Sequence, residues 1–185
     1  MLNSFFKSLQ LTLPSFVSVE KHNLYDFCLK VNNPSKIQEV ILFLRDHENF
    51  LFKMVIDILS IDFPTSEYRF QIVYNLLSIK YNVRLQVILN TKELHPIKSI
   101  VILHNSANWL EREIFDMHGI FFSNHPDLRR ILTDYGFEGF PLRKDFPLSG
   151  YVESRFDDSQ KRVITEAIEL TQEYRNFDFK NPWVN

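Results

Sequence analysis

Acidic and histidine side chains gather in one stretch of the sequence, and such groups act as general acids and bases or as metal ligands. The stretch contains Glu111, Glu113, Asp116, His118, His125 and Asp127. On a helix, the side chains of Glu111 and Glu113 would point about 160° apart. Glu113 and Asp116 would instead share a face with Arg112, which would neutralise them. No nucleophile–base pair and no metal-ligand spacing stands out, so the pattern favours a structural role such as an Arg112–Asp116 ion pair.

A second group of charged residues lies in the run from Gly139 to Gly150. Between its two prolines, apolar residues and charges follow one another as Pro141, Leu142, Arg143, Lys144, Asp145, Phe146 and Pro147. This pattern is typical of an extended strap whose charges meet partners while its apolar side chains fill pockets. A charged surface loop is the alternative. A phosphate-binding loop is excluded, because the run lacks both G-x-G-x-x-G and the Walker lysine pattern.

The composition limits what these motifs can serve. The chain has 185 residues, enough for one domain plus an extension, and its net charge of −2 argues against a sequence-independent nucleic-acid binder. No apolar run approaches the ~20 residues that span a bilayer. Cys28 is the only cysteine, which excludes an internal disulfide, a cysteine-rich zinc site and an iron–sulfur cluster held by this chain alone.

Residue usage indicates an AT-rich genome, because Phe, Tyr, Met, Ile, Asn and Lys far outnumber Gly, Ala, Arg and Pro. An organellar genome fits this usage, and a bacterial one stays open. Residues 1–14 contain no arginine and lack the charged start, apolar centre and small-residue cleavage site of a signal peptide. We therefore expect no targeting segment.

The part of the chain before Gly119 contains no glycine and must position both motifs. Asn33-Pro34 predicts the start of a helix. The apolar residues after it repeat at i, i+3, i+4 and i+7, at Ile37, Val40, Ile41 and Leu44. Alternating apolar residues predict strands near 16–19, 25–31, 52–58, 68–76 and 83–89. We expect an α+β fold: a two-layer domain with a mostly antiparallel sheet and helices on one face.

Beyond residue 99 the pattern becomes helical again. A helix that reaches Met117 and ends at Gly119 can dock an apolar stripe on the sheet, formed by Leu110, Ile114 and Met117. At most two helical turns begin at His125. From Thr133 the period weakens and prolines force extended backbone. We therefore expect residues 1–122 to form the α+β domain and residues 123–185 to form an extended C-terminal strap that packs on a partner.

Together the motifs resemble the signature of one family. The run Glu-Arg-Glu-Ile-Phe-Asp-Met-His-Gly-Ile-Phe-Phe (111–122) is similar to the 30-kilodalton subunit of respiratory complex I, the NADH:ubiquinone oxidoreductase. So are His-Pro-Asp-Leu-Arg-Arg-Ile-Leu (125–132) and Pro-Leu-Arg-Lys-Asp-Phe-Pro-Leu (141–148). The family includes the organelle-encoded NADH dehydrogenase subunit 9 and its bacterial counterpart. The likeness covers essentially the whole chain, and His118 departs from it by replacing an aromatic or aliphatic residue.

The resemblance implies a non-catalytic structural subunit of the hydrophilic, peripheral arm of complex I. The assembly passes electrons from NADH to ubiquinone and translocates protons, while NADH, FMN, the iron–sulfur clusters and ubiquinone are bound by other subunits. The implied partners are the 49-kilodalton quinone-site subunit and other hydrophilic-arm subunits. The implied location is the matrix side of the mitochondrial inner membrane, with no bound nucleic acid and no membrane span.

The resemblance also implies which residues contact partners or brace the extension, with no catalytic, cofactor-binding or metal-binding residue among them. They are Glu111, Arg112, Glu113, Asp116, Gly119, His125, Pro126, Asp127, Arg129, Arg130, Pro141, Leu142, Arg143, Lys144, Asp145, Phe146 and Pro147.

Two alternatives stay open. The first is a related scaffold subunit of a membrane-bound hydrogenase complex, against which the organellar-type composition counts. The second is a free-standing acid–base enzyme that uses the carboxylates of residues 111–127, which requires a cleft with two convergent, unneutralised carboxylates.

Overall fold

The computed structural model describes residues 2–21, 27–169, 172, 175–181 and 183. The chain divides into two compact units, Met1–Phe146 and Pro147–Asn185. Within the described residues, no helix is long and apolar enough to cross a membrane.

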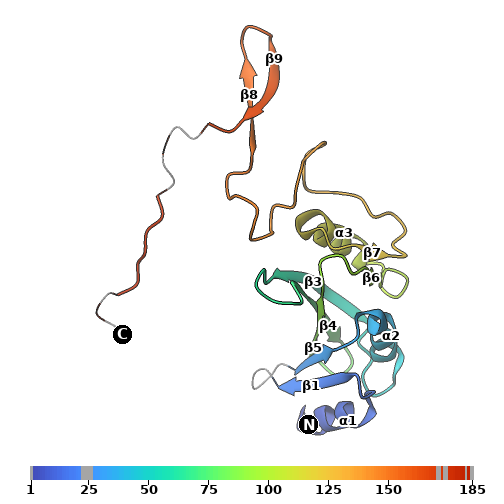
Figure 1. Ribbon diagram of the computed structural model, residues 1–185. Coiled ribbons are helices and arrows are strands. Elements are labelled where there is room, and N and C mark those ends of the chain that lie inside the picture. Colours follow the sequence, from blue (N-terminus) through green and yellow to red (C-terminus); the bar gives the residue numbers. More distant parts are fainter. Residues whose placement is uncertain (1, 22–26, 170–171, 173–174, 182, 184–185) are drawn as a thin grey trace. The chain divides into compact units, whose positions relative to one another are not determined.

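The first unit is built on a five-stranded sheet whose strand order is β1-β2-β5-β4-β3 (Figure 1). The strands are β1 (Val17–Lys21), β2 (Phe27–Val31), β3 (Met54–Asp62), β4 (Phe70–Ser78) and β5 (Val83–Thr91). All neighbouring pairs are antiparallel except β2 and β5, which run parallel. The predicted α+β class with a mostly antiparallel sheet is therefore confirmed.

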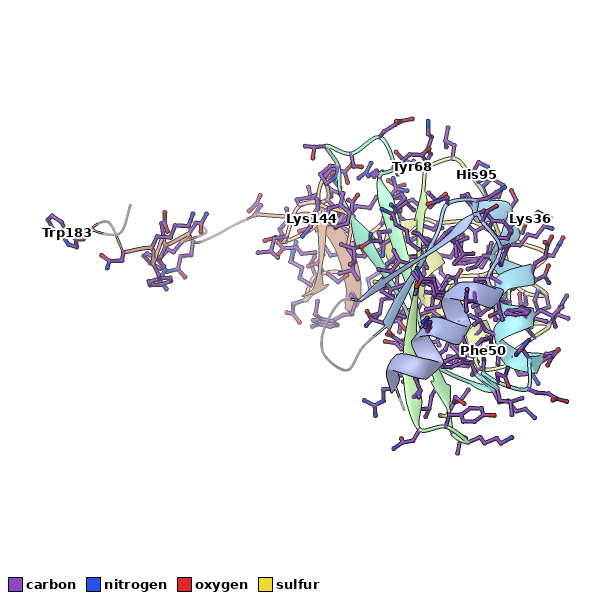
Figure 2. The ribbon with its side chains drawn as sticks, turned by 90° about the horizontal axis from the view of Figure 1, so that it is seen from below. Lys36, Phe50, Tyr68, His95, Lys144 and Trp183 are labelled. Carbon is purple, nitrogen blue, oxygen red and sulfur yellow. The ribbon has the colours of Figure 1, made fainter. Side chains whose placement is uncertain are left out.

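Helices pack on one face of this sheet. Helix α1 (Leu2–Thr12) and helix α2 (Ile37–Asp46) lie on the same side of the strands (Figure 2). The predicted stripe of α2 is buried and joins the core with Phe70, Ile72 and Tyr74 of β4. Asn33 and Pro34 begin a short 3₁₀ turn (Pro34–Lys36) that leads into α2, and the Asn33 side chain accepts the N–H of Ser35. The burial of one apolar face of helix and sheet is what stabilises this layer.

A third helix, α3 (Ala107–His118), follows the short strand β6 (Ile97–Lys98) and packs along β3. It ends as predicted at Gly119, whose φ of 75° places it in the left-handed region. Ser106 occupies the N-cap position without a capping side-chain hydrogen bond. Strand β7 (Phe122–Ser123) then pairs in parallel with β6.

One local prediction was wrong. Residues 125–132 contain no helical turn, because the Asp116 carboxylate binds the backbone N–H groups that a helix would use (below). The C-terminal region is extended, as expected, but the pairing of its strands β8 (Val152–Asp157) and β9 (Arg162–Ala167) into an antiparallel hairpin in the second unit was not predicted. The hairpin lies in a stretch without proline, where nothing prevents ladder hydrogen bonds.

Residues 123–146 belong to the first compact unit, which ends at Phe146. The prediction that residues 123–185 pack on a partner stays a prediction.

Candidate functional site

The second predicted motif folds onto the end of helix α3. We call residues 139–146 the bracing loop, and two turns close it, through Arg143 N–H to Phe140 O and Phe146 N–H to Arg143 O. Its backbone N–H at Leu142 donates to the carbonyl of Met117 (3.1 Å). The last carbonyls of a helix have no partner within the helix, so the bracing loop supplies one to α3.

Arg143 completes this cap. Its Nε donates to the carbonyl of His118 (2.7 Å), and its guanidinium lies over the rings of Phe140 (4.5 Å) and Phe70 (5.3 Å). A cation at a helix C-terminus is also favoured by the helix dipole. Gly119 leaves the space for this arrangement: a Cβ there would lie 2.7 Å from Arg143 Nη2 and from the Phe140 ring.

A buried carboxylate anchors the same loop from the sheet side. The Asp62 side chain, at the end of β3, is fully buried and accepts two hydrogen bonds from Arg69, at 2.8 and 3.1 Å. It also accepts the backbone N–H of Lys144 at 2.9 Å. Burial alone would raise the pKa of Asp62, but the hydrogen bonds from Arg69 and Lys144 outweigh it and lower the pKa. Asp62 therefore stays ionised and holds the loop to the sheet.

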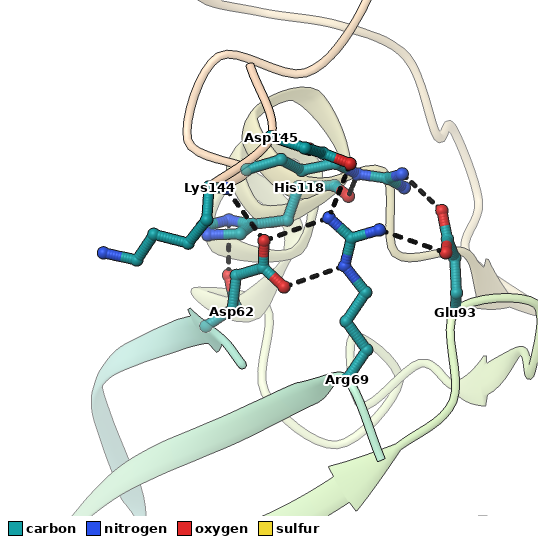
Figure 3. Close-up of polar contacts among 8 residues, drawn as sticks. Asp62, Arg69, Glu93, His118, Lys144 and Asp145 are labelled. Carbon is teal, nitrogen blue, oxygen red and sulfur yellow. Dashed lines mark hydrogen bonds and ion pairs between the residues drawn. The ribbon is translucent and has the colours of Figure 1, made fainter. Parts of the chain in front are cut away.

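Arg69 is the centre of the resulting ion network, which Figure 3 shows. Besides Asp62, its guanidinium contacts Glu93 (3.2 Å) and Asp145 of the bracing loop (3.0 Å). Glu93 in turn pairs with Arg143. The hydrogen bond with Asp62 raises the pKa of Arg69. Three carboxylates thus surround two guanidinium groups, and each charge has an opposite partner.

His118 departs from the family resemblance, and the structure accommodates it. Its Nδ1 is 2.7 Å from Ser60 Oγ on β3, and its ring meets Phe70 edge-on. Burial lowers the pKa of His118, the charge of Asp62 raises it and that of Arg143 lowers it, with a net lowering. The neutral imidazole therefore fills an aromatic position and satisfies one hydrogen bond.

A second anchor holds the segment before the bracing loop. One oxygen of Asp116 accepts the backbone N–H groups of Ile131 (3.1 Å), Leu132 (2.7 Å) and Thr133 (3.0 Å). The other accepts the Thr133 hydroxyl at 2.6 Å and lies 3.6 Å from Arg130 Nη1. Burial would raise the pKa of Asp116, but these hydrogen bonds lower it. The carboxylate is thus consumed in fixing residues 131–133.

The expected Arg112–Asp116 pair is replaced by other contacts. Arg112 Nε donates to the carbonyl of Arg129 (3.1 Å), and its guanidinium lies over the Trp109 ring (5.4 Å). Arg112 is therefore a second tie between α3 and the segment after β7. Arg129 itself is exposed and pairs with Asp127 (2.9 Å).

Glu111 is fully buried on another face of α3. Its carboxylate accepts the Ser99 hydroxyl (2.6 Å) and the N–H of Ile100 (2.8 Å). Burial raises the pKa of Glu111 to about 7, against these hydrogen bonds, which lower it. His125 Nε2 lies 3.9 Å away. Because His125 Nδ1 accepts the N–H of Asp127 (3.1 Å), its proton is on Nε2, which faces the carbonyl of Asn108 (3.3 Å).

The predicted site residues thus separate into an inner and an outer group. Inner side chains bond to the chain's own backbone or to its other side chains; they are Glu111, Arg112, Asp116, His125, Arg130 and Arg143. Gly119 allows their packing. Exposed residues are Glu113, Pro126, Asp127, Arg129, Leu142, Lys144 and Asp145; Pro141, Phe146 and Pro147 are half-buried.

Sequence reasoning missed the sheet-side half of the network, which consists of Ser60, Asp62, Arg69, Glu93 and Ser99. The available signal was the position of Asp62 and Arg69 at the ends of two successive strands. This signal is weak, because a charged residue at a strand end often belongs to the turn and has no distant partner. Within the described residues, no group of three or more His, Cys, Asp and Glu residues could hold a metal ion.

The fold and the network define a scaffold domain, in which the charged motif residues hold residues 123–146 on the sheet. The same fold occurs in a solved chain of the membrane-bound sulfane sulfur reductase (MBS), described as an archaeal respiratory membrane complex. The TM-score is 0.67 over 88% of this chain and 98% of that chain, at 19% sequence identity. At this identity the likeness concerns the fold.

Residues 30–152 match the family described as respiratory-chain NADH dehydrogenase, 30 Kd subunit. NADH-ubiquinone oxidoreductase subunit 9 of Reclinomonas americana is 48% identical over 98% of this chain and 90% of its own length. NADH dehydrogenase (ubiquinone) iron-sulfur protein 3 of Marchantia polymorpha is 55% identical over 97% of this chain and 91% of its own. This chain therefore belongs to the 30-kilodalton subunit family of respiratory-chain NADH dehydrogenase, as its motifs predicted.

Proposed function

We propose that the chain is a non-catalytic structural subunit of the hydrophilic arm of respiratory complex I, in which it braces the 49-kilodalton quinone-site subunit. The complex passes electrons from NADH to ubiquinone and couples this to proton translocation. Membership of the 30-kilodalton subunit family and near full-length similarity to NADH-ubiquinone oxidoreductase subunits support this role.

One structural observation supports a bracing role more than any other, and it is the surface of the hairpin β8–β9. Val152, Phe156 and Val163 share one face of the hairpin and are 55%, 59% and 66% exposed. The Arg155–Glu166 ion pair lies on the other face. A lone two-stranded hairpin is marginally stable in water, and exposed apolar faces mark interaction surfaces. We therefore assign this face to a contact with another protein of the complex.

We assign no catalytic residue and no cofactor to this chain. The 111–127 carboxylates do not form with one another the convergent, unneutralised pair that an acid–base enzyme needs, because Glu111 and Asp116 accept backbone N–H groups and Asp127 pairs with Arg129, which leaves Glu113 alone among them. Although one relative is named an iron-sulfur protein, a cluster requires about four cysteine ligands, and this chain has one cysteine. NADH, FMN, iron–sulfur clusters and ubiquinone then belong to other subunits.

The location that follows is the matrix side of the mitochondrial inner membrane, within the peripheral arm. The residue usage, which is typical of an AT-rich genome, supports an organelle-encoded chain. A scaffold subunit of a membrane-bound hydrogenase complex is the less favoured alternative, because the similar sequences are named as NADH dehydrogenase subunits.

The test is to replace the native chain by a tagged copy and to separate the membrane complexes on a native gel. The tag should co-migrate with NADH–quinone reductase activity in a megadalton-scale band. A second copy without residues 147–185, which lacks the hairpin, should be absent from that band. Migration of the full-length tag apart from the NADH–quinone reductase band, or with hydrogenase activity, would contradict the proposal.

A further inference from the structure

The edge strand β3 carries an exposed apolar stripe that takes no part in the ion network around Arg69. Met54, Ile56, Leu59 and Ile61 are 46%, 43%, 47% and 41% exposed, whereas Ile58 and Asp62 on the core side are buried. In the described part of the chain, β3 ends the sheet and pairs with β4 alone. Strand edges of this length usually carry lysine or proline that discourages pairing, and the nine residues of β3 contain neither.

A groove of about 180 Å³ runs beside this edge, between β3 and α3. Ile114 and Met117 of α3 and Leu142 of the bracing loop line its apolar part. Asp57 and Glu113, both acidic, also line this groove. Neither side chain has an ion-pair partner among the described residues. By contrast, the carboxylates that hold residues 123–146 do have such partners; they are Asp62, Glu93, Asp116 and Asp145.

Asp57 also protects the edge. Its carboxylate accepts the N–H of the adjacent Ile58 at 2.8 Å, which keeps that amide from pairing with another strand. A cation that draws the Asp57 carboxylate into the groove would release the Ile58 N–H for a neighbouring carbonyl. Binding of a cation in the groove and pairing of a strand at the edge would therefore assist each other.

We propose that the β3 edge receives an extended, apolar segment of a neighbouring complex I subunit, which inserts one lysine or arginine side chain into the groove between β3 and α3. The aliphatic stem of such a side chain packs on Ile114, Met117 and Leu142, and its charged head meets Asp57 and Glu113. This inference rests on the proposed function, because the neighbour is a subunit of that complex.

The charges argue against a second copy of this chain as the occupant. Strand β3 reads Met-Val-Ile-Asp-Ile-Leu-Ser-Ile-Asp and contains two acidic residues and no basic one. Two β3 edges in contact would bring like charges together without a cation for the groove, which is destabilising. A basic segment of another subunit satisfies both the edge and the carboxylates.

Carboxylate labelling with a carbodiimide and glycine ethyl ester tests this on the purified chain and on the purified complex. Asp57 and Glu113 should react in the free chain and be protected by about ten-fold or more in the complex, as expected for a desolvated charge pair. If the inserted side chain is lysine, the carbodiimide without glycine ethyl ester should cross-link it, through an amide bond, to Asp57 or Glu113.

A charge-reversal variant gives a second readout. Glu113→Lys, co-expressed with the wild-type chain, should be recovered in the complex at about one thirtieth of the wild-type amount or less. The matched control is Glu39→Lys, also at an exposed helix position, where Glu39 pairs with Lys36 of its own helix turn; this variant should compete equally.

The outcomes separate the two proposals. A chain that never enters the complex defeats the proposed function itself. A chain that enters while Asp57 and Glu113 stay as reactive as in the free form defeats only the present inference. Cross-links to a second copy, or to this chain's own residues 147–185, likewise overturn the assignment to a neighbouring subunit.

Discussion

Substitution of Gly119 by alanine should disrupt the contact between helix α3 and the bracing loop and so destabilise the folded chain. Gly119 has a φ of 75°, and an added Cβ would lie 2.7 Å from both Arg143 Nη2 and the Phe140 ring. Gly136 has nearly the same φ of 73° and no atom within 4 Å of an added Cβ. Both glycines have the left-handed backbone conformation that strains an alanine, and of the two only Gly119 has atoms close enough to clash with an added Cβ.

The magnitude follows from these two contributions. A left-handed conformation costs alanine about 1–2 kcal/mol, and this applies to Gly136→Ala and Gly119→Ala alike. At Gly119 the Arg143 side chain must also move, which weakens its charge-assisted hydrogen bonds to the His118 carbonyl and to Glu93. Hydrogen bonds to charged groups contribute about 1.5–3 kcal/mol. We expect a loss of about 2.5–5 kcal/mol for Gly119→Ala and of about 1–2 kcal/mol for Gly136→Ala.

The assay is urea unfolding of the full chain, followed by circular dichroism, with wild type and both variants under one buffer condition. The free energy of unfolding should fall in the order wild type, Gly136→Ala, Gly119→Ala. If the two variants are destabilised equally, within about 0.5 kcal/mol, the packing of Arg143 and Phe140 over Gly119 does not contribute to stability and the reasoning is refuted.

Three further predictions concern charge and cofactor content. Arg143→Ala should lower the amount of assembled complex on a native gel, because Arg143 is 14% exposed and multiply bonded, whereas Lys161→Ala, at a 72% exposed position, should not; equal loss would contradict this. Glu111 has a folded pKa of about 7, above its usual 4.5, so the folded state binds the extra proton and stability falls as pH rises from 4.5 to 7. Wild type should therefore lose roughly 3 kcal/mol relative to Glu111→Gln between pH 4.5 and pH 8 in urea unfolding; parallel pH curves would disprove it. The purified chain should show no visible absorption or paramagnetic signal in stoichiometric amount, since one cysteine cannot hold a cluster, and a stoichiometric signal would overturn the assignment.

Much of the fold could be predicted because its pattern is local. Strand β5 alternates apolar and polar residues without interruption, and the stripe of α2 follows the helical period; both elements were placed within a few residues. The parallel pairing of β2 with β5 was not predicted, because the sequence of a strand does not by itself determine which strand it pairs with. The hairpin β8–β9 was missed, because the prolines that flank it were given weight over the proline-free stretch between them.

The candidate site shows the same limit. The motif residues Asp116 and Arg143 were identified from the sequence, but their partners lie 15 to 50 residues away, in the 131–133 backbone and at Glu93. Such pairings depend on the folded topology rather than on spacing. The sequence groups Glu111, Arg112 and Asp116 in one charged motif. In the folded chain each of them has different hydrogen-bond partners.

The first unit should fold on its own ion network, while the second unit gains its order from the complex. Amide hydrogen exchange on the free chain and on the assembled complex tests it most directly. Residues 54–62, 70–78 and 107–118 should be protected in both states, because their hydrogen bonds are internal to the first unit. Residues 147–185 should exchange rapidly in the free chain and be strongly protected in the complex. Strong protection of residues 147–185 in the free chain would contradict the account, because the second unit would then be ordered without a partner.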